Sequence, residues 1–388
     1  MNQFKEVIII VTLLSVTLLG VNYSIQASHS LDKTSQSDAE SVHGNETAIR
    51  VALLLDTSGS MSGLIEQAKS QLWNILNELN TYKIDGETPR ILISLYEYGK
   101  DSHGYSNGYI KRILPFTADM DMVSEELFQL HTNGSKEYCG QVLYRSVDDL
   151  IWGNNESDLR LVYIAGNESI NQGSITFSKA CKEARDIGIT VNTIFCGDRQ
   201  SGIELGWKQG AEMGNGEYMN INHNQETVYY HSPYDDKIQE LNIRLNMTFI
   251  PMGKKGKVAY DNQARQDLNA GLKSKANVVN RAAYKISSNY KSESWDLVDA
   301  YENDKKVIEE DSNLPDEYRG LSDDEISLKI EEKKQERQEI KDQIKALKEK
   351  RDIHVTEQKA SQESAPSDLQ ESIIKSVEKV AKDKNYKK

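Results

Sequence analysis

The residues with the clearest chemistry lie in the segment Asp56-Thr57-Ser58-Gly59-Ser60, in which an aspartate is followed by serines at the next two alternate positions. A carboxylate and two hydroxyls are hard oxygen donors, which suit Mg²⁺ or Mn²⁺ and can also accept Ca²⁺. Gly59 allows the tight turn that would aim all three at one point. An isolated segment of this kind is also typical of a simple turn with Asp56 as a helix cap, so its place in the fold must decide.

The flanking pattern predicts that Asp56 ends a buried strand. Residues 49–55 form a near-continuous apolar run of strand length, typical of a parallel strand covered on both faces. Further strand patterns occur at 91–98, 109–116, 159–165, 190–196 and 217–221, and helical patterns lie between them and at 234–246. This alternation predicts an α/β domain over residues 49–250, with a doubly wound, mostly parallel sheet flanked by helices. Ligands bind at the carboxyl ends of strands in such sheets, which favours the metal interpretation.

The segment Asp56-Thr57-Ser58-Gly59-Ser60, after the apolar strand, resembles the metal-ion-dependent adhesion site of von Willebrand factor A (VWA) domains. The resemblance implies that Asp56, Ser58 and Ser60 hold a divalent cation, and that an open coordination position takes an acidic group from a partner. In that family a threonine from a later loop joins the shell. Here that loop is residues 130–140, and we favour Thr132 over Ser135 and Glu137 as its oxygen donor.

The sequence departs from the family at the end of the fourth strand. VWA domains usually place an aspartate there, whereas this chain has Gly166 followed by Asn167 and Glu168. Glycine has no ligand atom, so either Asn167 or Glu168 substitutes or the shell is one carboxylate short. Residues 133–140 and 161–173 resemble an exported bacterial subgroup of VWA domains.

Other chemistry is less well supported by the sequence. A serine nucleophile in a G-x-S-x-G elbow is excluded because the middle position between Gly59 and Gly63 is Met61. The histidines at 103, 131 and 223 fall in predicted loops with no spacing that ties them to a serine. Two cysteines, Cys139 and Cys196, are expected at the same end of the sheet, so a disulfide between them is one hypothesis; three buried thiols, with Cys181 in the core, is the other.

The structures of the segments outside the α/β domain are predicted from their composition. Residues 1–28 predict a secretory signal peptide, because Lys5 precedes an apolar run of about 15 residues; an uncleaved membrane anchor is the alternative. Residues 29–48 are a polar linker. Residues 257–356 predict a helical region, with a charged helix at 322–351 that forms either a packed hairpin or short coiled coil or a solvated helix. Residues 357–388 predict a second polar linker and a short terminal helix.

Charge and composition limit the function. The chain of 388 residues has 47 basic and 60 acidic residues, a net charge of −13, which argues against nucleic acid as a partner. With 28% charged residues, a protein with many membrane spans is excluded, and none is expected after signal cleavage. We therefore expect an exported, periplasmic or extracellular, metal-dependent protein-binding or adhesion module without catalysis, whose partner presents an acidic group. The alternative is a metal-free scaffold or assembly subunit that binds through its C-terminal helices.

Overall fold

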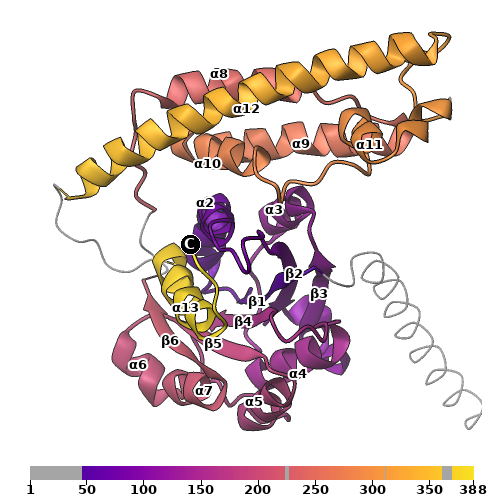
Figure 1. Cartoon of the computed structure of the whole chain (residues 1–388). Coiled ribbons are helices and arrows are strands. Elements are labelled where there is room, and N and C mark those ends of the chain that lie inside the picture. Colours follow the sequence, from indigo (N-terminus) through magenta and orange to yellow (C-terminus); the bar gives the residue numbers. More distant parts are fainter. Residues whose placement is uncertain (1–45, 223–226, 311, 361–368) are drawn as a thin grey trace, which may run out of the picture.

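The computed structural model of the chain describes residues 46–222, 227–310, 312–360 and 369–388 (Figure 1). The expected signal peptide over 1–28, most of the linker over 29–48, residues 361–368 of the second linker and His223 lie outside the described residues. Within the described ranges, an α/β domain lies beside a layer of long helices.

A six-stranded sheet forms the centre of the α/β domain, in the order β3-β2-β1-β4-β5-β6. Its strands are β1 (Ala48–Asp56), β2 (Arg90–Tyr98), β3 (Ile110–Thr117), β4 (Leu159–Gly166), β5 (Thr190–Cys196) and β6 (Asn215–Ile221). All neighbours pair in parallel except β3, which runs antiparallel to β2. The predicted strands and the mostly parallel α/β class are therefore confirmed. Because β1 pairs with β2 on one side and β4 on the other, Asp56 lies at the centre of the sheet's carboxyl edge, in register with Tyr98.

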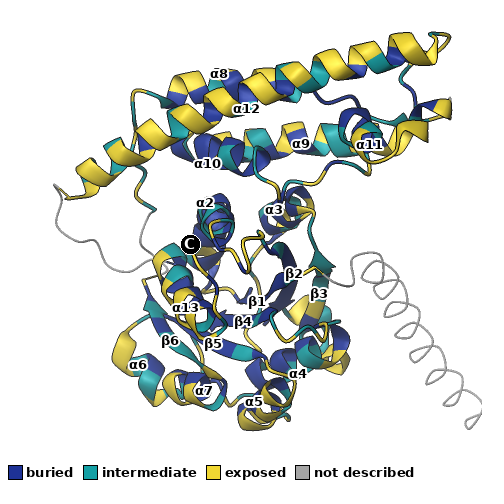
Figure 2. Cartoon of the chain, in the orientation of Figure 1, coloured by how far each residue is buried: buried dark blue, intermediate teal, exposed yellow. Residues whose placement is uncertain are grey.

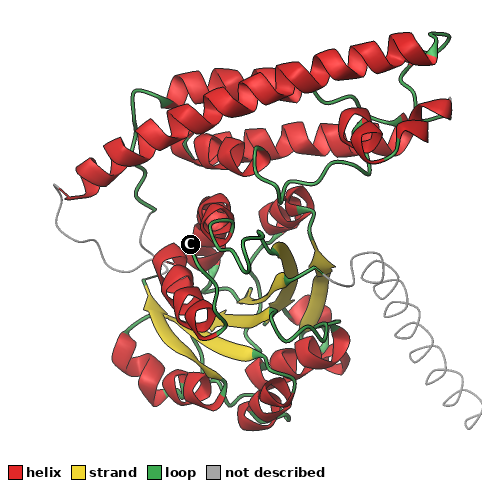
Figure 3. Cartoon of the chain, viewed as in Figure 1, coloured by secondary structure: helices red, strands yellow, loops and turns green. Residues whose placement is uncertain are grey.

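Helices cover both faces of the sheet (Figure 3). Side chains alternate along β1, so that Val51 and Leu55 join one apolar cluster and Ala52 and Leu54 join the other. The first cluster is closed by α2 (Ser62–Leu79) and α3 (Met120–Gln129). The second is closed by α4 (Cys139–Asp149), α5 (Phe177–Asp186) and α7 (Trp207–Met213), and α6 (Arg199–Glu204) lies next to α7. Figure 2 shows the resulting buried strands.

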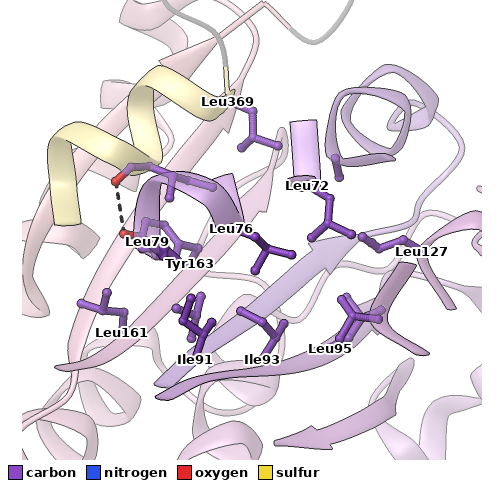
Figure 4. Packing of buried hydrophobic residues seen from close by; sticks show 14 of the residues in the cluster. Leu72, Leu76, Leu79, Ile91, Ile93, Leu95, Leu127, Leu161, Tyr163 and Leu369 are labelled. Carbon is purple, nitrogen blue, oxygen red and sulfur yellow. Dashed lines mark hydrogen bonds between the residues drawn. The ribbon is translucent and has the colours of Figure 1, made fainter. Parts of the chain in front are cut away.

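The C-terminal helix α13 (Leu369–Asp383) returns to this sheet and packs against α2 and β6. Its residues Leu369, Ile373 and Val377 are buried in the same cluster as Leu72 and Leu76 of α2 (Figure 4). The hydroxyl groups of Tyr163 on β4 and Ser376 on α13 lie 2.6 Å apart in a hydrogen bond. An apolar cavity of about 40 Å³ remains between α2, α13 and the sheet. The terminal helix is thus part of the sheet domain's core.

Helix α8 (Asp235–Asn246) differs from its predicted place in the series of sheet-covering helices. It packs against α10 (Lys275–Lys285) and α12 (Asp323–Ala360), away from the sheet. Its apolar residues share a buried cluster with side chains of those two helices: Ile238, Leu241, Leu245, Val279, Ala282, Ile340 and Ile344. The sheet is covered without α8, with α2, α3 and α13 on one of its faces, and α8 buries its apolar stripe in the helical layer.

The helical layer also contains α9 (Gly253–Lys273) and α11 (Leu297–Asn303). The 3₁₀ turns are η1 (Asp101–His103), η2 (Tyr105–Asn107), η3 (Lys305–Glu309) and η4 (Asp316–Tyr318). Helix α12 is packed against this layer through buried Ile326, Ile330, Ile340 and Ile344, so the solvated alternative for the charged helix is wrong. None of the helices within the described ranges has the length and apolar character needed to cross a membrane.

A buried ionic contact joins the two layers. The Arg281 guanidinium of α10 lies 2.5 Å from the Asp121 carboxylate of α3 and stacks over the Trp73 ring of α2, 4.6 Å from its centroid. The Tyr290 hydroxyl donates to the other Asp121 oxygen at 2.8 Å. The helical layer is therefore held against α2 and α3 by a specific set of polar contacts in addition to packing.

Candidate functional site

The predicted oxygen donors meet where β1 ends. Asp56 is fully buried, and its Oδ1 accepts a hydrogen bond of 2.7 Å from the Ser58 backbone N–H. The Ser58 and Ser60 hydroxyl oxygens lie 3.4 Å apart. This turn is short because α2 begins at Ser62, so all three side chains stay at the carboxyl edge of the sheet. The structure thus brings together the three residues that the sequence singled out.

The loop between α3 and α4 packs directly on this turn. The Gly59 backbone N–H donates to the Gly134 carbonyl at 3.1 Å, and the Asn133 N–H donates to the Thr57 carbonyl at 2.8 Å. Gly134 has a left-handed φ of +98°, and a Cβ there would lie 2.4 Å from the Gly99 carbonyl oxygen, so only glycine fits this approach. These contacts carry the loop to the edge of the Asp56 site.

Of the three donors considered in that loop, Glu137 is the one that reaches the site. It is 3% exposed, and its Cγ borders Gly99 beside Asp56 Oδ1. Thr132 is half-buried and Ser135 is exposed, and neither hydroxyl has a hydrogen bond to Asp56, Ser58 or Ser60 in the described structure. The sequence preference for Thr132 rested on the family pattern, and Glu137 was its weaker alternative.

The pKa values of the two buried carboxyl groups, Asp56 and Glu137, are both raised. Burial raises the pKa of Asp56 well above its ordinary value, and the Glu137 charge raises it further, against hydrogen bonds from Ser58. Burial likewise raises the pKa of Glu137 to about 7, with Ser58 opposing the shift and Glu168 adding to it. Two adjacent buried carboxylates repel unless a proton or a cation lies between them.

Three acceptor oxygens at this site have no donor among the described residues. They are buried atoms of three different segments: Asp56 Oδ2, Glu137 Oε2 and Asn167 Oδ1. A buried oxygen without a hydrogen-bond donor is costly, and a cation satisfies several such oxygens together. The donor set therefore fits a divalent cation, with carboxylate, hydroxyl and amide oxygens and no sulfur or nitrogen.

The candidate site contains few of the His, Cys, Asp and Glu side chains that hold the ion in most metal centres. No group of three or more His, Cys, Asp or Glu side chains in the described ranges is arranged to hold an ion. A cation here must therefore rely on the hydroxyls of Ser58 and Ser60 as much as on the carboxylates.

The segment after β4 supplies less than the family pattern requires. Asn167 donates its Nδ2 to the Ser60 hydroxyl at 2.9 Å, whereas Glu168 is exposed and its backbone carbonyl accepts from Trp207 Nε1 at 2.7 Å. The charge of Glu168 still acts on Asp56 and Glu137 through space. At Gly166, an added Cβ would lie 2.7 Å from the Tyr98 hydroxyl and 3.1 Å from the Trp207 ring, so those side chains fill the space of the missing aspartate.

The cysteines do not pair. All three are free and buried, so the hypothesis of a Cys139–Cys196 disulfide is replaced by its alternative of three buried thiols. The Cys139 thiol donates to the Tyr98 hydroxyl at 3.6 Å, and that hydroxyl donates to the Ala165 carbonyl at 2.9 Å. Cys139 is therefore used to hold Tyr98 in the space beside Gly166.

A second polar cluster, around Glu97, supports the same turn. This cluster was not predicted from the sequence. Glu97 on β2 is buried, and its carboxylate contacts Lys100 at 2.8 Å and His103 at 2.9 Å. The Thr57 hydroxyl donates to Glu97 at 3.4 Å and to the Tyr98 carbonyl at 3.1 Å. An acid near the end of an otherwise apolar strand was the available signal. His131 is exposed and lies outside this cluster.

The order of the strands decides the fold. A sheet ordered β3-β2-β1-β4-β5-β6 with only β3 antiparallel, and a D-x-S-x-S turn directly after the central β1, is the arrangement of VWA domains. The sheet domain has a VWA fold. Its last helix is α13, so the helical layer is inserted between β6 and the end of the sheet domain.

Comparison with known proteins gives similarities to VWA structures over less than half of the chain. A membrane protein related to aerotolerance from Bacteroides fragilis is 19% identical, with 45% of this chain and 93% of that chain covered and a TM-score of 0.31. A thread matrix protein of the mussel byssus with a zinc-occupied adhesion motif is 11% identical, with coverage of 46% and 43% and a TM-score of 0.35. A von Willebrand factor type A structure from Catenulispora acidiphila is 14% identical, with coverage of 45% and 39% and a TM-score of 0.34.

The match therefore spans less than half the length of the mussel and Catenulispora chains. No sequence family and no curated protein sequence matches the chain.

Proposed function

We propose that the VWA domain binds a divalent cation, Mg²⁺ or Mn²⁺ with Ca²⁺ as the third option, through Asp56, Ser58, Ser60 and Glu137. The observation that carries this proposal is the convergence of buried, unpartnered oxygens of Asp56, Glu137 and Asn167 at one end of the sheet. Glu137 takes the role of second carboxylate that Gly166 cannot fill.

The bound cation supplies an electrophilic position that attracts an acidic group of a protein or surface partner. The chain's own residues hold the position: Ser58 N–H fixes Asp56, and the loop contacts at Gly59 and Thr57 fix Glu137. We further propose that the protein is exported and acts by binding without catalysis.

Titration calorimetry with MgCl₂, MnCl₂ and CaCl₂ on the purified protein tests the proposal. We expect saturable heat and a rise in melting temperature by mass action. Asp56→Ala should abolish both, and Glu137→Gln should weaken binding by about tenfold or more, equivalent to ~1.4 kcal/mol. Thr132→Ala should leave the affinity close to that of the wild type. Asp261→Asn, at an exposed carboxylate on α9, is the matched control.

An absence of divalent-dependent heat at millimolar cation would reject the proposal in favour of the metal-free scaffold. A loss of binding in Thr132→Ala together with unchanged binding in Glu137→Gln would retain the cation but return the ligand role to the threonine.

A further inference from the structure

Three tyrosines form a continuous edge-to-face series beside the candidate metal site. The Tyr138 and Tyr109 rings lie 5.4 Å apart between centroids at 80°, and the Tyr109 and Tyr105 rings lie 6.4 Å apart at 74°. Tyr138 directly follows Glu137, so the series begins at the candidate ligand. It ends at Tyr105, whose side chain is 78% exposed. We name Tyr105, Tyr109 and Tyr138 the tyrosine series.

The loop that carries Tyr105 and Tyr109 is held rigidly. Tyr109 has a left-handed φ of +59°, which is strained for a bulky aromatic residue. Its backbone N–H donates to the Gly104 carbonyl at 3.1 Å, and its carbonyl accepts from the Gly99 N–H at 3.1 Å. Arg145 of α4 donates to the Asn107 carbonyl at 3.2 Å. Hydrogen bonds on both sides of Tyr109 therefore hold a strained conformation that presents Tyr105 to solvent.

Residues 136–138 place the Lys136 ammonium group and the Tyr138 ring on the outer side of the site. Lys136 forms an antiparallel bridge with Gly99, so the backbone is extended there, and successive side chains point in opposite directions. Burial follows this alternation: Lys136 is exposed, Glu137 is buried towards Asp56, and Tyr138 is half-buried. Lys136 has no ion-pair partner in the part of the chain that the structure describes.

We propose that this rim binds an acidic polypeptide segment in which an aromatic side chain lies close to the carboxylate that meets the cation. The inference rests on the proposed metal function and specifies its partner. Tyr105 is exposed and is backed by the half-buried Tyr109 and Tyr138. An exposed tyrosine on such a rigid support offers a large contact area at little cost in conformational entropy, as in protein-binding hot spots. A second acidic side chain of the segment pairs with Lys136, because opposite charge across the rim favours the correct orientation.

The test uses short synthetic peptides in matched sets, measured by fluorescence anisotropy in MgCl₂ and in EDTA. One set carries two glutamates and a nearby tryptophan, a second replaces tryptophan by alanine, and a third replaces both glutamates by glutamine. We expect the first set to bind only with Mg²⁺ and the other two to bind about tenfold more weakly or not at all. Tyr105→Ala and Lys136→Gln should each weaken the first set by about tenfold.

Leu272→Ala and Lys254→Gln, at exposed positions of α9, are the matched controls and should bind the peptides as the wild type does. Calorimetric heat of Mg²⁺ binding should be unchanged in Tyr105→Ala, which separates the rim from the metal site. The inference would be overturned if the protein binds Mg²⁺ but none of the peptides. It would also be overturned if the peptides bind equally well without tryptophan or in Tyr105→Ala. Either outcome leaves the metal proposal standing. Polygalacturonate, an acidic polysaccharide, serves as the alternative ligand. If it binds in a Tyr105-dependent manner and the peptides do not, the inference of a polypeptide partner is also overturned. Absence of Mg²⁺ heat in the wild type would reject both.

Discussion

At the scale of single residues, the site joins the turn that holds Asp56, Ser58 and Ser60 to Glu137 of a loop whose position depends on packing. Asp56, Ser58 and Ser60 were predictable because their spacing within one turn determines their separation. Glu137 was only one of three alternatives, because which side chain of a loop points inward depends on contacts such as that of Gly134 with Gly99. The roles of Glu97 and Tyr98 required the register of β1 with β2.

Gly166 is expected to resist restoration of the family aspartate. Its Cβ position lies 2.7 Å from the Tyr98 hydroxyl and 3.1 Å from Trp207, so Gly166→Ala should destabilise the fold by about 1–3 kcal/mol through overpacking. Tyr98→Phe in the same chain should recover part of that loss by removing the hydroxyl. Urea denaturation of the single and double variants measures this. Gly166→Asp with undiminished stability and tighter Mg²⁺ binding would contradict our account of this space.

At the scale of elements, periodicity predicted the helices but not their partners. The segments at 234–246 and at the C-terminus both read as amphipathic helices, yet α8 joins the helical layer and α13 joins the sheet. An apolar stripe has the same sequence pattern whichever surface covers it. The sequence of each helix alone therefore could not predict that α8 packs in the helical layer and α13 on the sheet. Arg337 lies between Ile330 and Ile340 in α12 and is buried with them, a position that an apolar pattern alone does not assign to the interior.

Arg337 is expected to be important for the helical layer. Its guanidinium contacts Asp296 at 2.7 Å and Asp299 at 2.6 Å, donates to the Thr248 carbonyl at 2.7 Å, and lies 4.2 Å from the centroid of the Phe249 ring. Arg337→Met should cost about 3–5 kcal/mol in unfolding free energy, because it leaves the fully buried Asp296 uncompensated. Adding Asp296→Asn should recover part of the loss. Thermal denaturation of the two variants checks this, and additive losses would refute the pairing.

Lys285 is expected to make the stability of the helical layer depend on pH. Burial lowers the pKa of this amine from near 10.5 to about 8, although Asp267 opposes the shift. Between these values the unfolded chain holds a proton that the folded chain has lost, so Lys285 adds stability as pH rises through this window. Burial raises the pKa of the Cys139, Cys181 and Cys196 thiols, which act in the opposite sense.

The effect of Lys285 is therefore isolated by comparing the wild type with a variant that lacks only this amine. The unfolding free energy of the wild type relative to Lys285→Met should increase from pH 7.5 to pH 9.5, measured by urea denaturation at each pH. Lys275→Met, at an exposed position of the same helix, should show no such increase. A difference that stays constant across the window would contradict the shifted pKa.

At the scale of the whole molecule, the helical layer is inserted into the sheet domain, whose last helix, α13, follows that layer in the sequence. Composition predicted a boundary near residue 250, since strand patterns stop there, and this boundary remains a prediction for autonomous folding. The structure adds that the sheet core also needs residues after the helical layer: Leu369, Ile373 and Val377 lie within its largest apolar cluster. The helical layer is held against the sheet domain by the Arg281–Asp121 contact and by the packing of α10 on α2 and of α9 on α3.

A chain that ends at Ala360 is therefore expected to lose much of its stability, because it lacks α13. Each of Leu369, Ile373 and Val377 contributes about 1.5–3 kcal/mol when fully buried, and their sum is a large share of a typical domain's 5–15 kcal/mol. The truncated protein should melt at a lower temperature and bind a hydrophobic dye at the exposed wall of the cavity. A synthetic peptide of residues 369–388 should restore the melting temperature in proportion to its concentration. The same peptide with Ile373→Asp and Val377→Asp should not, because it cannot bury its apolar face between α2 and β6. An unchanged melting temperature in the truncated chain would show that the sheet core closes without α13.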